Sequence, residues 1–222
     1  MRITDDEVTR VLADSPAFRG VSQARVQAVL AQLGCTVRNY AERDFIAHAG
    51  DAMRTYPVVL AGIVEARLPK AGAGGYTIVG RFAPGDSFAE AVPTTLKHSP
   101  VDIVCIEPSS VVLIPAARLE EGDDNDCLRV RANLLAEMSK KISELSYKLA
   151  LFAEPRLRNR LLMYLQAQDA DGSGAVTLEY NRKELASYLG VNDKALSREL
   201  RRLQDEGVLA VDGKRVRILG NA

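Results

Sequence analysis

Residues 182–204 read RKELASYLGVNDKALSRELRRLQ, and this stretch decides the fold of the carboxyl-terminal part of the chain. A helix through Leu185 and Leu189 is expected to end at Gly190, because glycine readily adopts the left-handed conformation that terminates helices. Asn192 is a suitable N-cap for a second helix, since its side-chain oxygen accepts a hydrogen bond from a free backbone N–H. Two helices joined by so short a glycine-containing turn are typical of a helix-turn-helix.

The second helix has two chemically different faces. At about 100° per residue, Leu196, Leu200 and Leu203 fall within one narrow stripe. The opposite face carries the polar and cationic set Lys194, Ala195, Ser197, Arg198, Arg201 and Arg202. Arginine pairs with guanine O6 and N7, serine or alanine approaches base edges or a thymine methyl, and cations neutralise phosphates. We therefore expect this face to bind double-stranded DNA. Base reading is assigned to Lys194, Ser197 and Arg198, and phosphate contacts to Arg201 and Arg202.

A basic hairpin is expected downstream. Val208–Val211 and Val216–Ile218 flank the sequence Asp212-Gly213-Lys214-Arg215. Asp-Gly between β-branched runs is a strong hairpin signal, and it places the cations Lys214 and Arg215 at the tip, where they can contact backbone phosphate. A helix-turn-helix followed by such a hairpin is typical of a winged helix. The alternative is a ligand-binding module whose helix-turn-helix is only structural, with a solvated basic face.

The segment before this winged helix is expected to be one long helix. Asp126–Phe152 contains no glycine or proline, and its apolar residues are separated by 3, 4, 3, 4 and 3 positions. These residues are Leu135, Met138, Ile142, Leu145, Leu149 and Phe152. So narrow a stripe favours a coiled-coil seam and hence a homodimer, the alternative being a helix packed on the core of its own domain. Pro155 begins a new element, so we place the domains at residues 1–125, 126–153 and 154–222.

The amino-terminal part changes from a helical to a β-rich pattern near Thr36. Residues 4–33 carry two short helical patterns. From Thr36 to Pro115, short β-branched runs alternate with turns that contain glycine or proline, which is typical of an antiparallel barrel or jelly roll. The runs are Val58–Leu60, Ile63–Val64, Thr77–Val79, Ile103–Val104 and Val111–Ile114, and one of the turns is Gly72–Gly75. The expected fold class is therefore α+β, with an antiparallel β-roll, a long dimerisation helix and a winged helix-turn-helix.

Composition and charge exclude several classes of protein. The 222 residues are 47% apolar and 26% charged, which is ordinary for a globular chain. No apolar stretch approaches the ~20 residues of a membrane helix, and the acidic start lacks the features of a signal peptide, so a cytoplasmic location is expected. Residues 1–154 hold 17 Lys+Arg against 20 Asp+Glu, whereas residues 155–222 hold 12 against 9. The basic excess therefore lies in the helix-turn-helix part.

Neither an enzyme nor a metal site is predicted. Cys35, Cys105 and Cys127 are widely spaced without a CxxC pair, so no disulfide framework or zinc site is indicated. No Ser/His/Asp, Cys/His or paired-carboxylate arrangement supports catalysis.

The order of these elements resembles the CRP/FNR family of bacterial transcription regulators over essentially the full chain. The motifs similar to that family are Leu60–Val64 and Phe82–Glu90 in its cyclic-nucleotide-binding-type roll, and Leu185–Val191 and Leu196–Leu200 in its paired DNA-binding helices. The resemblance implies a small effector near Phe88, Glu90 and Ala91, between the roll and the long helix. It also implies a homodimer on a near-palindromic DNA site, with RNA polymerase as a further candidate partner.

Departures from the family pattern bear on the effector and on the DNA site. Cyclic-nucleotide binders follow the cassette glutamate with an Arg-Ser or Arg-Thr pair, whereas this chain has His98-Ser99-Pro100-Val101-Asp102 in that region. A phosphate there lacks its charge-assisted partner, so cyclic AMP is not the expected effector. Three scattered cysteines cannot supply the four that the oxygen-sensing branch uses for an iron–sulfur cluster. His48 and His98 are candidate ligands of haem, which leaves a haem-based gas or redox sensor as an alternative. Lys194 replaces a frequent base-reading glutamate, so the DNA half-site is expected to differ.

Overall fold

The computed structural model describes residues 3–69, 75–169, 172–178 and 180–219. The chain forms two compact units, residues 1–141 and 142–222, and each has its own hydrophobic core. Helix α4 (Asn125–Ala153) begins in the first unit and ends in the second. The domain boundaries expected near residues 125 and 154 stay a prediction.

Two helices open the first unit, as the sequence predicts. Helix α1 (Asp5–Asp14) begins with a capping box: Thr4 Oγ1 accepts from the Glu7 N–H, and the Glu7 carboxylate accepts from the Thr4 N–H. A 3₁₀ turn, Pro16–Phe18, leads to α2 (Gln23–Leu33).

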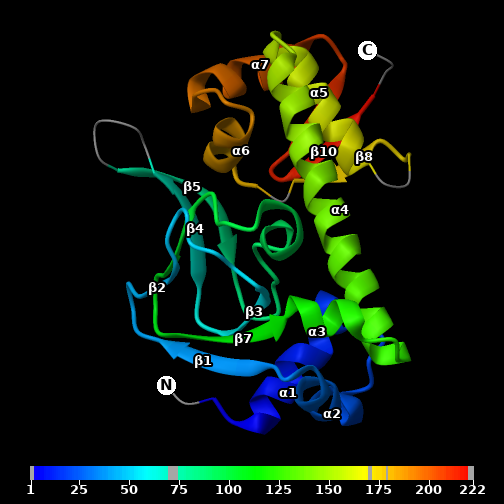
Figure 1. Ribbon diagram of the computed structural model, residues 1–222. Coiled ribbons are helices and arrows are strands. Elements are labelled where there is room, and N and C mark those ends of the chain that lie inside the picture. Colours follow the sequence, from blue (N-terminus) through cyan, green and yellow to red (C-terminus); the bar gives the residue numbers. More distant parts are fainter. Residues whose placement is uncertain (1–2, 70–74, 170–171, 179, 220–222) are drawn as a thin grey trace. The chain divides into compact units, whose positions relative to one another are not determined.

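The β-rich part forms two antiparallel sheets. Its strands are β1 (Thr36–Tyr40), β2 (Phe45–Ala47), β3 (Thr55–Ala61), β4 (Val64–Pro69), β5 (Tyr76–Phe82), β6 (Asp102–Cys105) and β7 (Ser109–Pro115). One sheet has the order β1-β7-β3 and the other β2-β6-β4-β5 (Figure 1). The predicted antiparallel roll is confirmed. Of the turn predicted at Gly72–Gly75, only Gly75 lies within the described residues.

Strand β7 anchors the roll because both of its faces are buried. Val112 and Ile114 pack against the core that includes α1 and α2. Val111 and Leu113 face the other way and pack with Phe88 in a second core, which contains residues of both sheets. Successive side chains of a strand point to opposite faces, so a strand buried on both faces carries the unbroken apolar run seen at Val111–Ile114.

Helix α3 (Ala116–Glu121) precedes α4. The start of α4 is fixed by Asp124, whose Oδ1 accepts from the N–H groups of Asp126 and Cys127 at 3.0 and 3.1 Å. Hydrogen bonds from the thiol and the backbone N–H of Cys127 lower the pKa of Asp124 to about 2. Asp124 therefore acts as an ionised N-cap, and the helix begins one residue before the predicted Asp126.

The second unit is a winged helix-turn-helix, as predicted. After α4 its elements are α5 (Leu157–Gln168), β8 (Ala175–Thr177), α6 (Arg182–Tyr188), α7 (Asp193–Asp205), β9 (Leu209–Asp212) and β10 (Arg215–Ile218). The strands form an antiparallel sheet in the order β8-β10-β9. Leu165, Leu200 and Val216 join the helices and the sheet in one core. The α+β fold class is thus confirmed. In the described part of the chain, no helix has the length and apolar character needed to cross a membrane.

Candidate nucleic-acid interface

The turn between α6 and α7 is fixed by the two residues that the sequence identifies. Gly190 has a φ of +69°, and the Val191 N–H donates to the Ala186 carbonyl at 2.9 Å, which closes the end of α6. Asn192 caps α7, because its Oδ1 accepts from the Ala195 N–H at 2.9 Å. The caps leave a turn of four residues between the helices.

Helix α7 buries its leucine stripe and exposes its cations. Leu196, Leu200 and Leu203 are at most 2% exposed. The residues expected to contact DNA on this helix are either exposed, namely Lys194, Ser197, Arg198, Arg201 and Arg202, or half-buried, namely Ala195. The leucines therefore fix the rotation of the helix, so that its cationic face points away from the core.

Two arginines of α7 are engaged by neighbouring residues. Arg202 Nε donates to Glu206 Oε1 at 2.9 Å, and Arg158 of α5 donates to the other oxygen of the same carboxylate. Hydrogen bonds from Arg158 and Arg202 hold the pKa of Glu206 below its ordinary value. Arg198 Nε donates to the Lys194 carbonyl at 3.3 Å, and among the described residues its terminal nitrogens make no hydrogen bond. Arg198 therefore keeps its terminal nitrogens for a paired contact, whereas the charge of Arg202 is partly neutralised.

A shallow hollow of about 500 Å³ lies on the helix-turn-helix. Its lining consists of Arg182, Ser197, Leu200, Arg201, Gln204 and Asp205. Two guanidinium groups and a hydroxyl in this lining can donate to an anionic oxygen, beside the carboxylate of Asp205. Arg182 was not among the residues expected from the sequence. Its place at the start of α6, the first helix of the motif, was the available signal.

The hairpin of β9 and β10 is the predicted wing, with a tighter turn than expected. Arg215 pairs with Asp212, so the turn consists of Gly213 and Lys214 alone. Gly213 has a φ of +58°, which suits the first turn position of a two-residue hairpin. Lys214 therefore lies at the tip. Arg215 lies in β10 instead, on the same face of the strand as the exposed Arg217, which the sequence did not single out.

The predicted dimer seam is largely exposed in the single chain. The side chains that are 47–62% exposed are Leu135, Ile142, Leu145, Leu149 and Phe152, and Met138 is half-buried. Leu128 is also exposed and lies seven residues before Leu135, so it extends the repeat by one heptad. It was not among the residues expected. A row of exposed large apolar side chains marks an interaction surface.

The last turns of α4 contact the helix-turn-helix within the second unit. A Cβ on Gly190 would lie 2.9 Å from Phe152 Cε1, and Lys148 Nζ lies 5.6 Å from the centroid of the Tyr188 ring. Phe152, expected in the dimer seam, therefore also packs against the turn that precedes α7. The end of the seam and the candidate DNA-reading helix are thus in contact within one protomer.

Two of the residues expected near an effector lie in different surroundings. Phe88 is 1% exposed, and its ring stacks on Phe82 with centroids 5.3 Å apart. Phe88 therefore belongs to the core that joins the two sheets. Ala91 is half-buried and precedes a π-helical turn, Val92–Leu96.

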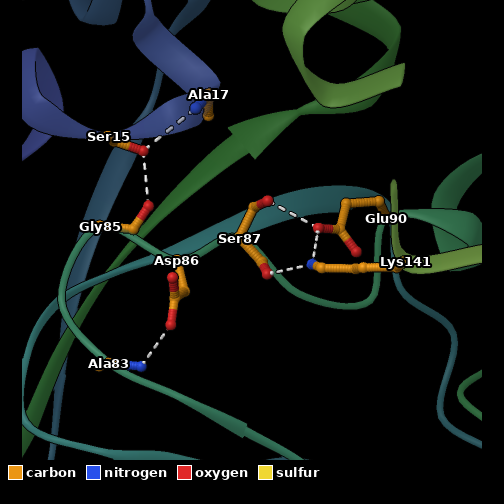
Figure 2. A network of polar contacts seen from close by, with 8 residues as sticks. All are labelled: Ser15, Ala17, Ala83, Gly85, Asp86, Ser87, Glu90 and Lys141. Carbon is orange, nitrogen blue, oxygen red and sulfur yellow. Dashed lines mark hydrogen bonds and ion pairs between the residues drawn. The ribbon is translucent and has the colours of Figure 1, made fainter. Parts of the chain in front are cut away.

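Glu90, the third of these residues, is buried, and one of its carboxylate oxygens is paired. Its Oε1 accepts from the Ser87 hydroxyl at 2.6 Å and from Lys141 Nζ at 2.5 Å (Figure 2). Lys141 comes from α4 and also donates to the Ser87 carbonyl at 2.7 Å. Sequence reasoning missed this cation, because Lys141 lies 51 residues beyond Glu90.

The candidate haem ligands are both exposed. His48 stacks on Phe45 with ring centroids 4.1 Å apart, and its Nδ1 lies 3.7 Å from Asp102 Oδ1. His98 is exposed beside a backbone bridge to Ala52. Neither residue is set in a buried apolar surrounding of the kind that encloses a haem.

The cysteines are placed as structural residues. Cys105 and Cys127 are buried and Cys35 is half-buried. Burial raises the pKa of Cys35 to about 12 and that of Cys127 to about 11. Both thiols are therefore protonated at neutral pH, whereas the thiolate is the nucleophilic form.

Two family models match the chain. A cyclic nucleotide-binding domain matches residues 37–123, which covers both sheets of the roll. A Crp-like helix-turn-helix domain matches residues 156–220, which covers the winged helix.

Similar individual proteins agree with the two family models. The transcriptional activator protein Anr from Pseudomonas protegens is 25% identical over 182 residues, which cover 79% of this chain and 73% of that protein. The transcriptional activator protein FnrA from Stutzerimonas stutzeri is 33% identical over 126 residues, 54% of this chain and 51% of that protein. The crystal structure of the Thermus thermophilus catabolite activator protein matches with a TM-score of 0.54 at 22% identity, covering 92% of this chain and 93% of that chain. That structural likeness supports the fold alone.

Proposed function

The chain belongs to the CRP/FNR family of transcription regulators, and we propose that it acts as a homodimer on near-palindromic double-stranded DNA. It is a DNA-binding transcription regulator with a cyclic-nucleotide-binding-like sensor domain. The proposal goes further and concerns the residues that contact DNA, the pairing of two protomers and the class of effector.

The observation that carries the proposal is the exposed cationic face of α7 on its buried leucine stripe. We assign base reading to Arg198, Ser197 and Lys194, since the terminal nitrogens of Arg198 suit guanine O6 and N7. Phosphate contacts are assigned to five cations of the helix-turn-helix and the wing, namely Arg182, Arg201, Arg202, Lys214 and Arg215. Phosphate contacts set the register of the protein on DNA, and base contacts set its sequence preference.

Pairing of two chains along α4 is supported by the exposed apolar repeat from Leu128 to Phe152. A twofold axis along such a seam gives two winged helices, and these enter successive major grooves when their centres are about 34 Å apart. A near-palindromic operator follows from the same symmetry. As a transcription regulator on such a site, the dimer is expected to act on RNA polymerase.

The effector is expected to be a small molecule other than cyclic AMP. A cyclic phosphate needs a charge-assisted partner, and residues 98–102 offer no arginine. Asp102 in that stretch is an acid that accepts from the Ala49 N–H at 2.8 Å. An effector acts by favouring one packing of the α4 pair, and the packing in turn sets the spacing of the two DNA-binding units.

A binding experiment with genomic DNA fragments tests the proposal. Fluorescence anisotropy is measured with the full-length protein from about 50 to 200 mM salt, and we expect the affinity to fall steeply, since phosphate contacts release counterions. The Arg198→Ala variant is expected to bind its specific site less tightly, with the preference relaxed at one base pair, and to keep salt-dependent non-specific binding. A protein that binds no fragment at low salt is instead a ligand-binding module with a structural helix-turn-helix.

A thermal-shift screen tests the effector class. We expect no stabilisation by cyclic AMP and stabilisation by a metabolite of another class. The absorption spectrum of the purified protein is recorded alongside. A Soret band that disappears in a His48→Ala or His98→Ala variant identifies a haem-based sensor instead.

A further inference from the structure

We call the loop of residues 83–91 the sensor loop. Two of its oxygen acceptors contact the ammonium group of Lys141. Lys141 Nζ lies 2.5 Å from Glu90 Oε1 and 2.7 Å from the Ser87 carbonyl oxygen. Nζ also lies over the ring of Phe82, 5.5 Å from its centroid. A carboxylate, a carbonyl and an aromatic ring are the groups that bind a primary ammonium.

The sensor loop is held in shape by contacts that do not involve Lys141. The Ser15 hydroxyl donates to the Gly85 carbonyl at 2.6 Å, and Asp86 Oδ2 accepts from the Ala83 N–H at 2.8 Å (Figure 2). The Val59 N–H donates to the Asp86 carbonyl at 2.9 Å. These contacts position the acceptors independently of Lys141, so the lysine binds at a site that is already formed.

The buried carboxylate explains why this site needs a cation. Glu90 is only 5% exposed, and a buried charge is costly unless it is paired and hydrogen-bonded. Its two partners are the Ser87 hydroxyl and Lys141. The Lys141 side chain is 39% exposed and that of Glu90 only 6%, so a small molecule from solvent reaches the acceptors where it displaces the lysine.

The position of Lys141 along α4 connects the sensor loop to the predicted seam. It lies directly before Ile142 and three residues after Met138, both in the predicted seam, and it ends the first compact unit. A contact that holds or releases Lys141 therefore acts on α4 where the helix leaves the roll. Such a two-state contact can bias a larger rearrangement.

We propose that Glu90, Ser87 and Phe82 form an ammonium-binding site that Lys141 fills from α4, and that a ligand bearing a primary ammonium group competes with Lys141 for it. Binding of that ligand releases α4 from the sensor loop. The link from this release to DNA affinity rests on the proposed function, whereas the site itself does not.

Chemical rescue tests the site. Lys141→Ala removes Cγ, Cδ, Cε and Nζ, and n-propylammonium supplies the same four atoms. We expect the variant to melt about 4 °C or more below wild type, and n-propylammonium chloride to restore at least half of that loss relative to sodium chloride and n-propanol at equal concentration. Lys140→Ala, at the exposed neighbouring position, is the matched control and should show no such rescue.

The double variant Glu90→Gln/Lys141→Ala tests whether the rescue depends on the Glu90 carboxylate. It should gain nothing from n-propylammonium, because the anionic acceptor is gone. Equal stabilisation of the single variant, the double variant and the control overturns the proposal. If Lys141→Ala does not fold, hydrogen exchange of wild type decides: n-propylammonium, and not n-propanol, should speed exchange in α4 around residues 138–142, and unchanged exchange overturns the site.

DNA binding then tests the coupling. Lys141→Ala is expected to change the affinity for an operator fragment by more than about threefold, and n-propylammonium should reverse the change. Unchanged affinity beside a successful thermal rescue overturns the coupling and supports the site. Wild-type protein that binds no DNA at all, with the rescue intact, refutes the proposed function and not the ammonium site.

Discussion

Helices α4 and α7 carry the same apolar periodicity, but the apolar face of α7 is buried within the protomer and that of α4 is exposed. In α7 the stripe Leu196, Leu200 and Leu203 is at most 2% exposed, because the rest of the winged helix covers it. In α4 the side chains of Leu145 and Leu149 are 61% and 62% exposed in the single chain. Periodicity thus identifies the apolar face of a helix and leaves open whether its own chain or a second copy covers that face.

The largest effect is expected from a charge placed in the α7 stripe. Leu200→Asp should destabilise the second unit by ~4 kcal/mol or more, since it buries an unpaired carboxylate and leaves a cavity. Thermal unfolding followed by circular dichroism measures the loss. Leu149→Asp is the matched control, because the same charge on the exposed stripe should leave the protomer folded. Equal destabilisation by both variants would remove the distinction between the two stripes.

The exposed stripe should respond through assembly and not through folding. Leu145→Asp is expected to weaken self-association by about 100-fold or more, which corresponds to ~2.7 kcal/mol. Light scattering coupled to size exclusion measures the oligomeric state at several concentrations. Ser146→Asp places the same charge on the next, exposed residue of α4 and should leave the dimer intact. A wild-type chain that stays monomeric at high concentration contradicts the seam.

The local signals around residues 182–204 allowed the helix-turn-helix to be predicted from sequence in detail. Gly190 and Asn192 act within a few residues of their own position, so their roles follow from backbone preferences alone. The antiparallel roll was also predicted, since its inner strands are buried and carry apolar runs. Strand β1 was not delimited, because four of its five residues are exposed and no apolar alternation marks it.

What the sequence could not supply depends on contacts between distant residues or on register. The Lys141–Glu90 pair joins residues 51 positions apart, and no local pattern encodes it. The wing was predicted, yet its turn is formed by Gly213 and Lys214, because pairing of Arg215 with Asp212 shortens it. The partial neutralisation of Arg202 likewise depends on a carboxylate whose second partner comes from α5.

The exposed cationic face of α7, opposite its leucine stripe, is tested by measuring DNA affinity. Arg198→Ala should cost about tenfold in affinity for the specific site, or ~1.4 kcal/mol, and relax the preference at one base pair. Arg201→Ala should weaken binding to all sequences alike and reduce the salt slope by about 1. Anisotropy on specific and scrambled fragments separates the two. Arg10→Ala, on the exposed surface of α1, should change neither quantity, and a uniform loss in Arg198→Ala argues against base reading.

The smallest effect on stability is expected at the N-caps of α4 and α7, which differ in chemistry. Asp124 caps α4 as a carboxylate whose pKa is lowered to about 2, whereas the Asn192 amide caps α7 and does not titrate. An unfolded aspartate has a pKa near 3.9, so the contribution of Asp124 is fully present above about pH 4 and is lost as the pH falls through about 2. Because Asp124 is partly exposed to solvent, the contribution is screened and small.

Two substitutions at Asp124 measure this difference. Asp124→Ala should cost about 1 kcal/mol at pH 7 by removing the cap, and Asp124→Asn should cost less than about 0.5 kcal/mol, since asparagine caps well. On acidification from pH 5 to pH 2, most of the advantage of wild type over Asp124→Asn should be lost, because the asparagine cap is insensitive to pH. Urea unfolding across this range gives the values. An advantage that is as large at pH 2 as at pH 5 shows that the Asp124 carboxylate does not carry the cap.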